Sequence, residues 1–377
     1  MIAKRLASRF QIYQDLNHCH CHIHNCLSFN ISNLKSIDNL TLTVCQLPWF
    51  ANASKIEKCE ITRTHNASFS NSVVFPGGVT EEADASDHWL PLFTNFGFTQ
   101  RDFESLHRPG AYTNLIFKDI PVRRHIALRI SAIRETFEEL GLLICCSDHK
   151  KKKSDSWTTV LSNIDTQYWQ SKVSKNPTEL FNLCKEYNCY PDIWSLHYWS
   201  NWLSPVTIPK RFDTAFYVAA VKDKPTTISS SNEVVKVEWA NPSDLLERNS
   251  KGEIKLHPPQ AYELNRLSHI SDLDKIINFA KNITSQGNEL IFPIPTRTKD
   301  GWVFLLPGDH LYPTNVDYNT EIITKEKTAL ELRDTTKTLH RIEIVGSDRL
   351  IVTHNYTPKN HINMGNQVKS VNISIHQ

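Results

Sequence analysis

The most regular spacing of apolar and polar positions in the chain lies in residues 127–143, ALRISAIRETFEELGLL. Apolar side chains recur near helical spacing from Leu128 to Leu140, with polar or charged residues between them. Gly141 follows directly and is a typical stop signal for a helix. The pattern predicts an amphipathic helix that packs one face against a core and leaves the other face for polar chemistry.

Shorter patterns predict the other elements. Strands are expected at residues 40–47, 72–78, 213–221 and 234–240. Helices are expected at 178–190, from 242 and over 258–285, with short β segments after about residue 290. Residues 80–125 carry several prolines and aromatic residues without strong periodicity, so we expect an insertion there with one short helix near Gln100–Leu106.

The composition excludes several classes of protein. The 377 residues suffice for one large domain or two ordinary ones. The chain has 42 basic and 40 acidic side chains, so its net charge of +2 is not the strongly basic balance of a general nucleic-acid binder. No run of about 18 apolar residues occurs, so no membrane span is expected. Neither GxGxxG nor GxxxxGK(S/T) occurs, which argues against a Rossmann dinucleotide site and a P-loop.

The amino end of the chain has an unusual composition. Residues 1–14, MIAKRLASRFQIYQ, are basic and have two interpretations, a mitochondrial leader or a frayed tail. The segment HCHCHIHNC at 18–26 carries ligand types that suit Zn²⁺ or Cu but lacks the paired spacing of a zinc finger. Metal binding and an adventitious tail are therefore alternatives for it. Nine cysteines without a secretory leader indicate reduced thiols and an intracellular protein.

Three acidic residues stand out within the predicted helix at 127–143. Glu138 and Glu139 stand three and four positions after Glu135, which places the three carboxylates on one helix face. Clustered carboxylates repel one another unless a cation lies between them. Hard divalent ions such as Mg²⁺ prefer oxygen ligands and retain water for substrate phosphates. Arg134 is placed to pair with Glu138 at i, i+4. The alternative interpretation is an exposed acidic face with an ordinary ion pair.

A glycine-rich turn stands upstream of this acidic helix. It reads Phe75-Pro76-Gly77-Gly78, and Asp84 follows six residues after Gly78. Together with REx₂EExG at 134–141, these residues resemble the box of the Nudix hydrolases, Gx₅Ex₇REUxEExGU, where U is a bulky apolar residue. Gly78 matches the leading glycine, and Asp84 stands where the first Glu usually stands. About 42 extra residues separate the two halves of the box.

A split box of this kind is similar to that of one branch of the superfamily, the peroxisomal acyl-coenzyme A diphosphatases. The resemblance covers roughly residues 60–312. It is carried by FPGGVTEEADASDHWLPLF (75–93), RISAIRETFEELGLL (129–143), PDIWSLHYWSNWLSP (191–205), KRFDTAFY (210–217), EVVKVEWANPSD (233–244), HPPQAYELNRL (257–267) and LLPGDHLY (305–312).

The resemblance implies a fold and a division of the chain. The fold is an α/β Nudix sandwich of α/β/α layers with a mixed β-sheet, a long insertion within the box and a C-terminal extension. We expect a basic, His/Cys-rich tail at 1–35, a Nudix domain at 36–255 with its insertion at about 85–125, and a helical and β extension at 256–377. The compartment implied is the peroxisome or, from the basic amino end, the mitochondrion, although the last residues are not an SKL-type signal.

The resemblance also implies an activity. The chain is expected to hydrolyse a diphosphate bond with Mg²⁺ or Mn²⁺ held by Glu135, Glu138 and Glu139, and with Glu135, Glu138 and Arg134 in catalytic roles. The expected substrate is coenzyme A or an acyl-coenzyme A, and the products are 3′,5′-ADP and a 4′-phosphopantetheine species. The alternatives are another nucleoside diphosphate derivative, such as a nucleotide sugar or capped RNA, a Nudix-fold binding module without turnover, and a metal-sequestering protein that uses the His/Cys segment.

The remaining candidate residues each have two interpretations. Gly77 and Gly78 let the chain turn tightly beside the helix and approach substrate. Arg211, with Lys210, either meets phosphates or is solvated, and Trp202 either stacks on a ligand or packs in the core. Asp84 either lies near the metal or caps a turn, and Glu233 is either a general base from a later loop or a strand-edge residue. The insertion either selects the substrate, through aromatics such as Trp89 and Phe93, or buttresses the sheet.

Overall fold

The computed structural model is built around one long strand, β9 (Phe212–Val221), whose side chains are buried at every position except the first. A continuous buried run of this kind is expected of a strand that is covered on both faces. β8 (His197–Leu203) pairs antiparallel with β9. β1 (Leu42–Gln46) and β2 (Trp49–Ala51) pair parallel with β9, and β5 (Gly77–Val79) pairs antiparallel with β1. The sheet is mixed, as predicted.

The structure describes most of the chain between residues 42 and 372. The described residues are 42–46, 49–51, 58–63, 72–149, 157–208, 210–229, 234–270, 272–319, 322–346, 349–363 and 369–372. Residues 37–377 form one compact unit. The His/Cys segment at 18–26, the basic amino end and Glu233 lie outside the described residues. The predicted division at 255/256 stays a prediction.

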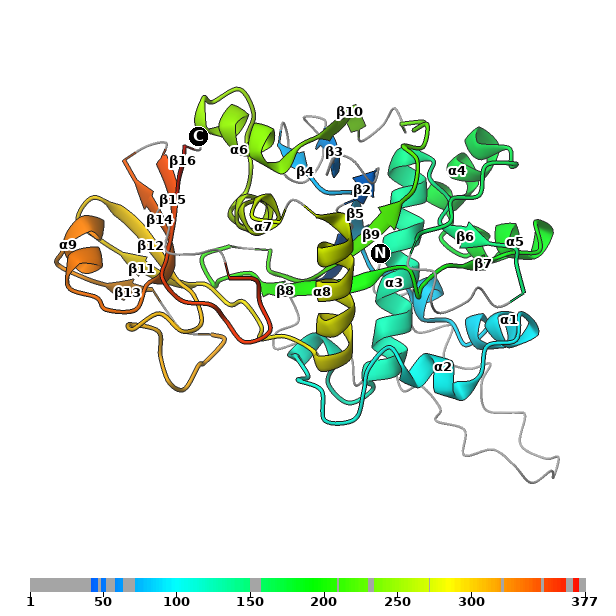
Figure 1. The fold of residues 1–377 in the computed structure, drawn as a ribbon, viewed down its shortest axis with the longest axis horizontal. Coiled ribbons are helices and arrows are strands. Elements are labelled where there is room, and N and C mark those ends of the chain that lie inside the picture. The colour runs from blue at the N-terminus through cyan, green and yellow to red at the C-terminus, as the bar shows by residue number, and fades with distance from the viewer. Residues whose placement is uncertain are drawn as a thin grey trace, which may run out of the picture. The chain divides into compact units, whose positions relative to one another are not determined.

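The predicted helix at 127–143 is α3 (Pro121–Leu140), which begins six residues earlier than expected. Pro121 stands in its first turn, where a missing N–H costs nothing. Gly141 ends the helix in the left-handed conformation at φ 68°, and its N–H donates to the carbonyl of Phe137. The apolar face from Leu128 to Leu140 is fully buried. α3 packs against β1 and β5 (Figure 1), so its polar face is carried on a rigid element.

The remaining elements surround this centre. The other strands before the C-terminal sheet are β3 (Lys58–Arg63), β4 (Val73–Val74), β6 (Cys145–Cys146), β7 (Tyr190–Pro191) and β10 (Val234–Ala240). β10, β3 and β4 form an antiparallel sheet, and β6 pairs with β7. The other helices there are η2 (Glu82–Ala85), α1 (Trp89–Asn95), α2 (Gln100–Glu104), η3 (Leu115–Phe117), α4 (Thr166–Lys175), α5 (Glu179–Glu186), α6 (Pro242–Ser250), α7 (Pro258–Ser268) and α8 (Leu273–Gln286).

The insertion between the two halves of the box packs its aromatic side chains into the core. Phe93 and Phe98 are buried, and both contact Trp194 of the aromatic segment at 191–205. The Phe98 and Trp194 rings are stacked with centroids 3.9 Å apart. Trp89 is also buried and meets Phe181 of α5 edge to face. Aromatic rings of this size bury large apolar areas, so these contacts tie the insertion to the rest of the fold.

The C-terminal part is a six-stranded sheet that carries a separate core on one face. Its strand order is β13-β11-β12-β14-β15-β16. The elements are β11 (Ile294–Arg297), β12 (Gly301–Leu305), β13 (Ile323–Thr324), α9 (Ala329–Asp334), β14 (His340–Val345), β15 (Arg349–His354) and β16 (Lys369–Asn372). A buried ion pair between Arg341 and Asp309 holds the sheet to the loop after β12, with an Nη2–Oδ1 distance of 2.7 Å.

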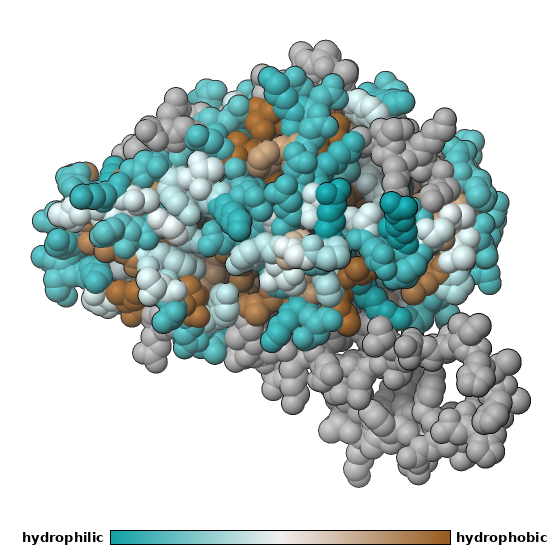
Figure 2. Space-filling view, turned by 60° about the horizontal axis from the view of Figure 1, so that its bottom comes forward, coloured by the Kyte–Doolittle hydropathy of each residue, from teal (hydrophilic) through white to brown (hydrophobic). Residues whose placement is uncertain are grey.

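The described surface is mostly hydrophilic on the face that Figure 2 shows. Figure 2 shows hydrophobic side chains gathered in small separate groups among hydrophilic ones. No helix within the described residues has both the length and the hydropathy needed to cross a membrane.

Candidate active site

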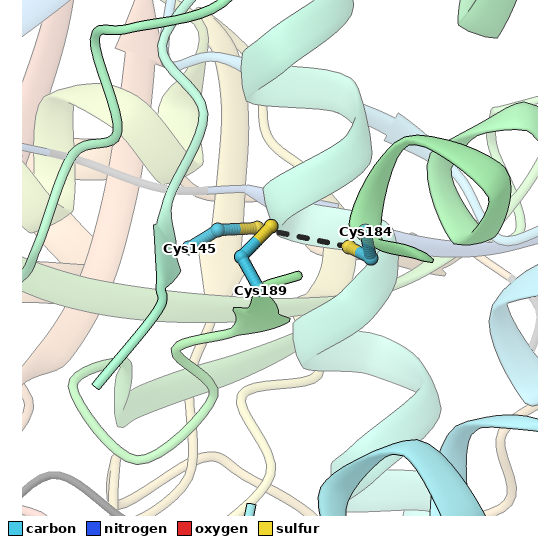
Figure 3. Close-up of side chains that lie close together, drawn as sticks. All are labelled: Cys145, Cys184 and Cys189. Atoms are coloured by element: carbon cyan, nitrogen blue, oxygen red, sulfur yellow. Dashed lines mark hydrogen bonds between the residues drawn. The ribbon is translucent and has the colours of Figure 1, made fainter. Parts of the chain in front are cut away.

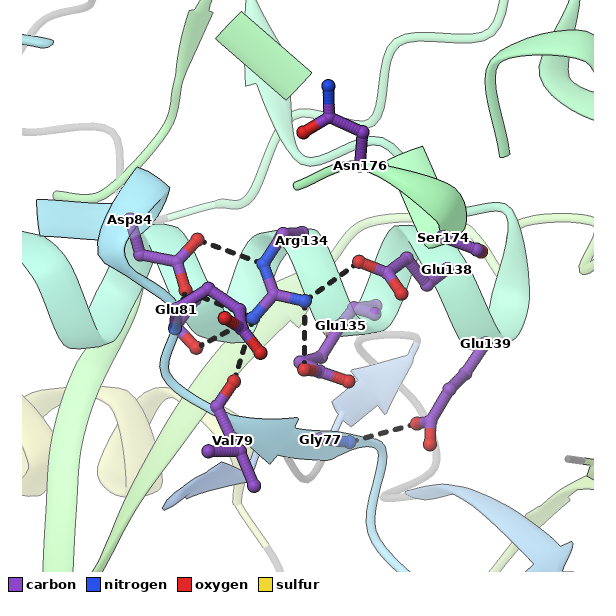
Figure 4. Close-up of polar contacts among 12 residues, drawn as sticks. Gly77, Val79, Glu81, Asp84, Arg134, Glu135, Glu138, Glu139, Ser174 and Asn176 are labelled. Carbon is purple, nitrogen blue, oxygen red and sulfur yellow. Dashed lines mark hydrogen bonds and ion pairs between the residues drawn. The ribbon is translucent and has the colours of Figure 1, made fainter. Parts of the chain in front are cut away.

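The three carboxylates predicted to act together lie on the last two turns of α3 and line one cavity (Figure 4). Arg134 Nη1 donates to Oε1 of Glu135 at 2.9 Å and to Oε1 of Glu138 at 2.7 Å. One guanidinium nitrogen therefore orients two of the carboxylates. The i, i+4 pair of Arg134 with Glu138 is present as the sequence predicted.

Arg134 is itself fixed from the other side by Asp84. Its Nε and Nη2 donate to the two carboxylate oxygens of Asp84 at 2.9 and 3.0 Å, and Nη2 also donates to the carbonyl of Val79 at 2.8 Å. Arg134 and Asp84 are 2% and 1% exposed, so their bidentate pair is shielded from water. Burial opposes the charge, but the hydrogen bond and charge of Asp84, with Glu135 and Glu138, raise the pKa of Arg134.

Asp84 does not face the cavity. Its Oδ2 accepts from the backbone N–H of Glu81 at 2.9 Å and closes a capping box at the start of η2. Of its two predicted roles, capping the turn is the one that the geometry supports. A role that the sequence did not predict is added, because Asp84 holds the arginine that orients the catalytic face. The insertion brings the two residues together across 50 positions of sequence.

The two glycines shape the turn opposite α3. The backbone N–H of Gly77 donates to Oε2 of Glu139 at 2.9 Å. Gly77 has φ 148°, which favours glycine. A Cβ on Gly78 would lie 2.5 Å from Cδ of Glu135, so a side chain there would displace that carboxylate. Both glycines line the cavity. Glycine is favoured at these positions because the backbone lies in close contact with Glu139 and Glu135.

We expect Gly78→Ala to reduce kcat/KM by about 100-fold, because displacing a reacting group by about 1 Å has an effect of that size. The fold should survive, since the Cβ meets the far end of a flexible side chain rather than backbone. Steady-state kinetics and thermal unfolding of the variant test this.

The matched control for Gly78→Ala is the same change in a Glu135→Gln background. If the glycine acts through Glu135, the added methyl group has little further effect in that background. An equal loss in both backgrounds would contradict the assignment.

The electrostatics of the cluster suit a bound cation. Burial raises the pKa of Glu135 to about 7, and the charges of Glu138 and Asp84 add to the shift against the opposing effect of Arg134. The oxygens of Glu135, Glu138 and Glu139, all within the described chain, do not all approach within 4.8 Å of one another. The three carboxylates are therefore spread along the cavity wall, and their oxygens do not converge on a single point. This donor set of hard oxygens fits a hydrated divalent ion.

The cavity beside the cluster has a volume of about 1070 Å³. One wall is polar and comes from α4, with Gln167, Gln170, Ser171, Ser174 and Lys175. A second part of the lining comes from the end of β8, the start of α7 and the C-terminal sheet, and it combines apolar side chains with the polar His257 and Gln260. A cavity of this size accommodates a ligand much larger than an inorganic pyrophosphate.

The other predicted residues differ in whether they line the cavity. Trp202 lines the cavity while its Nε1 donates to Oε1 of Glu263 at 2.7 Å. Arg211, although described, does not line it. Its guanidinium donates to the carbonyls of Ser204 and Tyr318 at 3.1 and 2.8 Å, which ties β9 to the C-terminal part. Lys210 lines the cavity in its place. The prediction that Arg211 meets substrate phosphates therefore finds no support in the geometry.

The structure does not support substrate selection by the insertion. None of residues 85–125, all of which are described, lines the cavity. Trp89, Phe93, Phe96 and Phe98, for which a ligand cover was one of the two interpretations, are buried in the core. The alternative interpretation, a buttress of the sheet, is the one that these contacts support. Aromatic residues without periodicity indicate burial, but their partner at 191–205 is not visible in the sequence.

The sequence interpretation missed α4 and the cavity residues that it carries. A signal was available, since Asp165 caps the helix by accepting from the N–H of Tyr168, and the apolar Trp169 and Val173 follow at helical spacing. The contribution of the C-terminal sheet had no sequence signal, because it depends on how two sheets pack.

A separate cluster of thiols lies away from this cavity (Figure 3). Cys145, Cys184 and Cys189 are completely buried, and their sulfur atoms lie within 4.8 Å of one another. All three are free thiols, as predicted for the chain. Burial raises the pKa of Cys145 and Cys184, whereas hydrogen bonds from these two residues lower the pKa of Cys189 to about 5. None of the three lines the cavity, so they take no part in the carboxylate site.

Known proteins match the chain over most of its length. The family model for the NUDT19 Nudix domain matches residues 42–267, and the model for the NUDT19 C-terminal domain matches residues 296–355. The acyl-coenzyme A diphosphatase NUDT19 of Xenopus laevis is 32% identical over 332 residues, which cover 83% of this chain and 87% of that protein. The Homo sapiens protein of the same name is 33% identical over 297 residues, which cover 74% and 78%.

The carboxylate helix, the glycine turn and these matches define a Nudix diphosphatase, an enzyme that hydrolyses a diphosphate bond in a small-molecule substrate. Within this class, the chain belongs to the NUDT19 family. Nudix hydrolases use divalent metal ions, and the carboxylate set described above fits such an ion.

Proposed function

We propose that the chain hydrolyses the diphosphate bond of coenzyme A or an acyl-coenzyme A, and releases 3′,5′-ADP and a 4′-phosphopantetheine species. The observation that carries the proposal is the cavity of about 1070 Å³, which joins the carboxylate face of α3 to a polar wall and an apolar wall. An acyl-coenzyme A has this division, since a phosphorylated nucleoside lies on one side of its diphosphate and the pantetheine arm with its apolar acyl chain lies on the other. The names of the Xenopus and human relatives support the same substrate.

Glu135, Glu138 and Glu139 are the residues that would hold Mg²⁺ or Mn²⁺. Such an ion neutralises phosphate charge and lowers the pKa of a water molecule. The protein's own contribution is orientation. Arg134 holds Glu135 and Glu138, and the N–H of Gly77 holds Glu139. Lys175 and Lys210 are cations on the cavity wall and are placed to meet the phosphates of a substrate.

The experiment that tests the proposal is a comparison of substrates with Mg²⁺ and, separately, Mn²⁺. The panel is coenzyme A, acetyl-coenzyme A, ADP-ribose, UDP-glucose and capped RNA. We expect kcat/KM for the coenzyme A compounds to exceed the others by at least about tenfold, since only these present both a nucleotide and a pantetheine arm.

If kcat/KM is highest for UDP-glucose or for capped RNA, the substrate is a nucleotide sugar or capped RNA and not a coenzyme A compound. Binding of coenzyme A without turnover, measured by calorimetry in the presence of each ion, would favour a Nudix-fold binding module. Location in the peroxisome or the mitochondrion stays a prediction, which microscopy of the full chain with markers for both compartments tests.

A further inference from the structure

The cavity wall formed by α4 differs chemically from the wall on the opposite side. α4 lies directly beside the catalytic face, because Nε2 of Gln170 donates to the carbonyl of Glu138 at 2.8 Å. Its cavity residues are two amides, two hydroxyls and the ammonium group of Lys175. These groups suit the hydroxyls, ring nitrogens and phosphate of a nucleotide.

The opposite wall presents apolar side chains from two parts of the fold. Trp202 and Leu203 end β8, and Phe304 and Ile342 come from the C-terminal sheet. Phe304 of β12 is directly opposite Ile342 of β14 in the antiparallel register, so their side chains share one face of that sheet. The neighbouring Val303 points to the other face and packs in the separate C-terminal core.

This apolar wall is fixed to the catalytic sheet by backbone contacts. The N–H of Leu203 donates to the carbonyl of Ile291 at 3.0 Å, and the N–H of Ile291 donates to the carbonyl of Asn201 at 2.9 Å. The segment that leads into β11 thus pairs with the edge of β8 through a parallel bridge between Ile291 and Trp202. A further hydrogen bond joins the hydroxyl of Tyr262 on α7 to Nε2 of His340 on β14 at 2.7 Å. The C-terminal sheet is therefore held as a rigid side of the cavity.

Trp202 is held in the wall by a buried carboxylate. Glu263 of α7 accepts from Nε1 of Trp202 and from Nε1 of Trp199, each at 2.7 Å, and it pairs with Arg266 at 2.7 Å. Glu263 and Arg266 are fully buried. With its N–H satisfied in this way, the indole is packed into the cavity wall at 3% exposure and supports the side chains beside it.

We propose that the C-terminal sheet, through the partly exposed Phe304, which packs beside the buried Ile342, forms the binding surface for the apolar acyl arm of the substrate and sets the preference for chain length. This inference rests on the proposed function. The C-terminal part is then a specificity element of the active site, and the α4 wall receives the nucleotide. Each methylene group buried on such a wall improves binding by about fourfold, so a medium-length acyl chain gives a measurable gain over free coenzyme A.

The test compares kcat/KM for coenzyme A, acetyl-, butyryl- and octanoyl-coenzyme A, with ADP-ribose as a substrate that lacks the pantetheine arm. In the wild-type protein we expect KM to fall as the acyl chain lengthens. In Phe304→Ser, we expect kcat/KM for octanoyl-coenzyme A to fall at least about tenfold more than that for ADP-ribose, since a polar group replaces apolar surface. Phe304→Leu should restore most of the preference.

Val303→Ala is the matched control, because Val303 is adjacent on β12 but faces the C-terminal core. If Phe304 acts only through the stability of the sheet, Val303→Ala changes the chain-length preference as much as Phe304→Ser. That result, or equal losses on all substrates in Phe304→Ser, overturns the inference while leaving the proposed function intact.

Phe304→Trp gives a second, independent measurement. It should narrow the wall and reduce kcat/KM for octanoyl-coenzyme A more than for acetyl-coenzyme A. Cleavage of ADP-ribose without cleavage of any coenzyme A compound overturns the proposed function itself.

Discussion

Glu139→Gln is expected to lower kcat by about 10²–10⁴-fold while the protein remains folded. Glu139 lines the cavity, and its carboxylate faces the glycine turn rather than the apolar core. A glutamine at this position keeps an oxygen that can accept from the N–H of Gly77, so the local geometry is retained. Only the charge is lost, and with it the ability to hold a hard divalent cation. Steady-state kinetics at saturating Mg²⁺, with circular dichroism of both proteins, checks this.

The matched control is Glu186→Gln. Glu186 is exposed and stands at the end of α5, as Glu139 stands near the end of α3, but it lies away from the cavity. The same chemical change there should leave kcat unaltered. A Glu139→Gln variant with the turnover of the wild-type protein would show that α3 is not the catalytic helix.

Arg134→Met is expected to lower the free energy of unfolding by about 3–5 kcal/mol. The change leaves Asp84, which is 1% exposed, as a buried charge without its bidentate partner. It also releases Glu135 and Glu138 from the nitrogen that orients them, so activity should be lost as well. Urea unfolding measured together with kinetics separates the two effects.

A double variant distinguishes stability from catalysis at this position. Asp84→Leu combined with Arg134→Met removes both buried charges, which should recover much of the lost stability but not the activity. Lys251→Met is the control for loss of an ion pair, because Lys251 pairs with Glu247 at the surface and its loss should not measurably change the urea midpoint. Full activity in the stabilised double variant would contradict the orienting role of Arg134.

The catalytic helix could be predicted because its evidence is local. The apolar face of α3, the stop at Gly141 and the spacing of the glutamates are all properties of one continuous segment. The partner of Arg134 could not be predicted in the same way. Asp84 lies 50 positions upstream, and a capping residue and a metal ligand are the same residue type in a sequence.

The predicted roles that the geometry does not support concern contacts between distant segments. Arg211 stands beside Lys210, and the sequence gives no means to decide which of the two faces the cavity. In the structure, Arg211 stands just before β9 with its guanidinium directed to the C-terminal part, and Lys210 lines the cavity. For the aromatic residues of the insertion, the sequence left a ligand cover and a buttress of the sheet as alternatives, and in the structure Phe93 and Phe98 pack against Trp194.

The measurement that tests the central claim most directly is the mass of the products formed from octanoyl-coenzyme A with Mg²⁺ in ¹⁸O-labelled water. The account predicts 3′,5′-ADP and octanoyl-4′-phosphopantetheine, with one ¹⁸O atom in one of the two new phosphate groups, because water opens the diphosphate bond beside Glu135, Glu138 and Glu139. The same reaction with Glu139→Gln should give neither product at a comparable rate. Release of octanoate and intact coenzyme A, which is thioester hydrolysis, or loss of the 3′-phosphate alone, would contradict it.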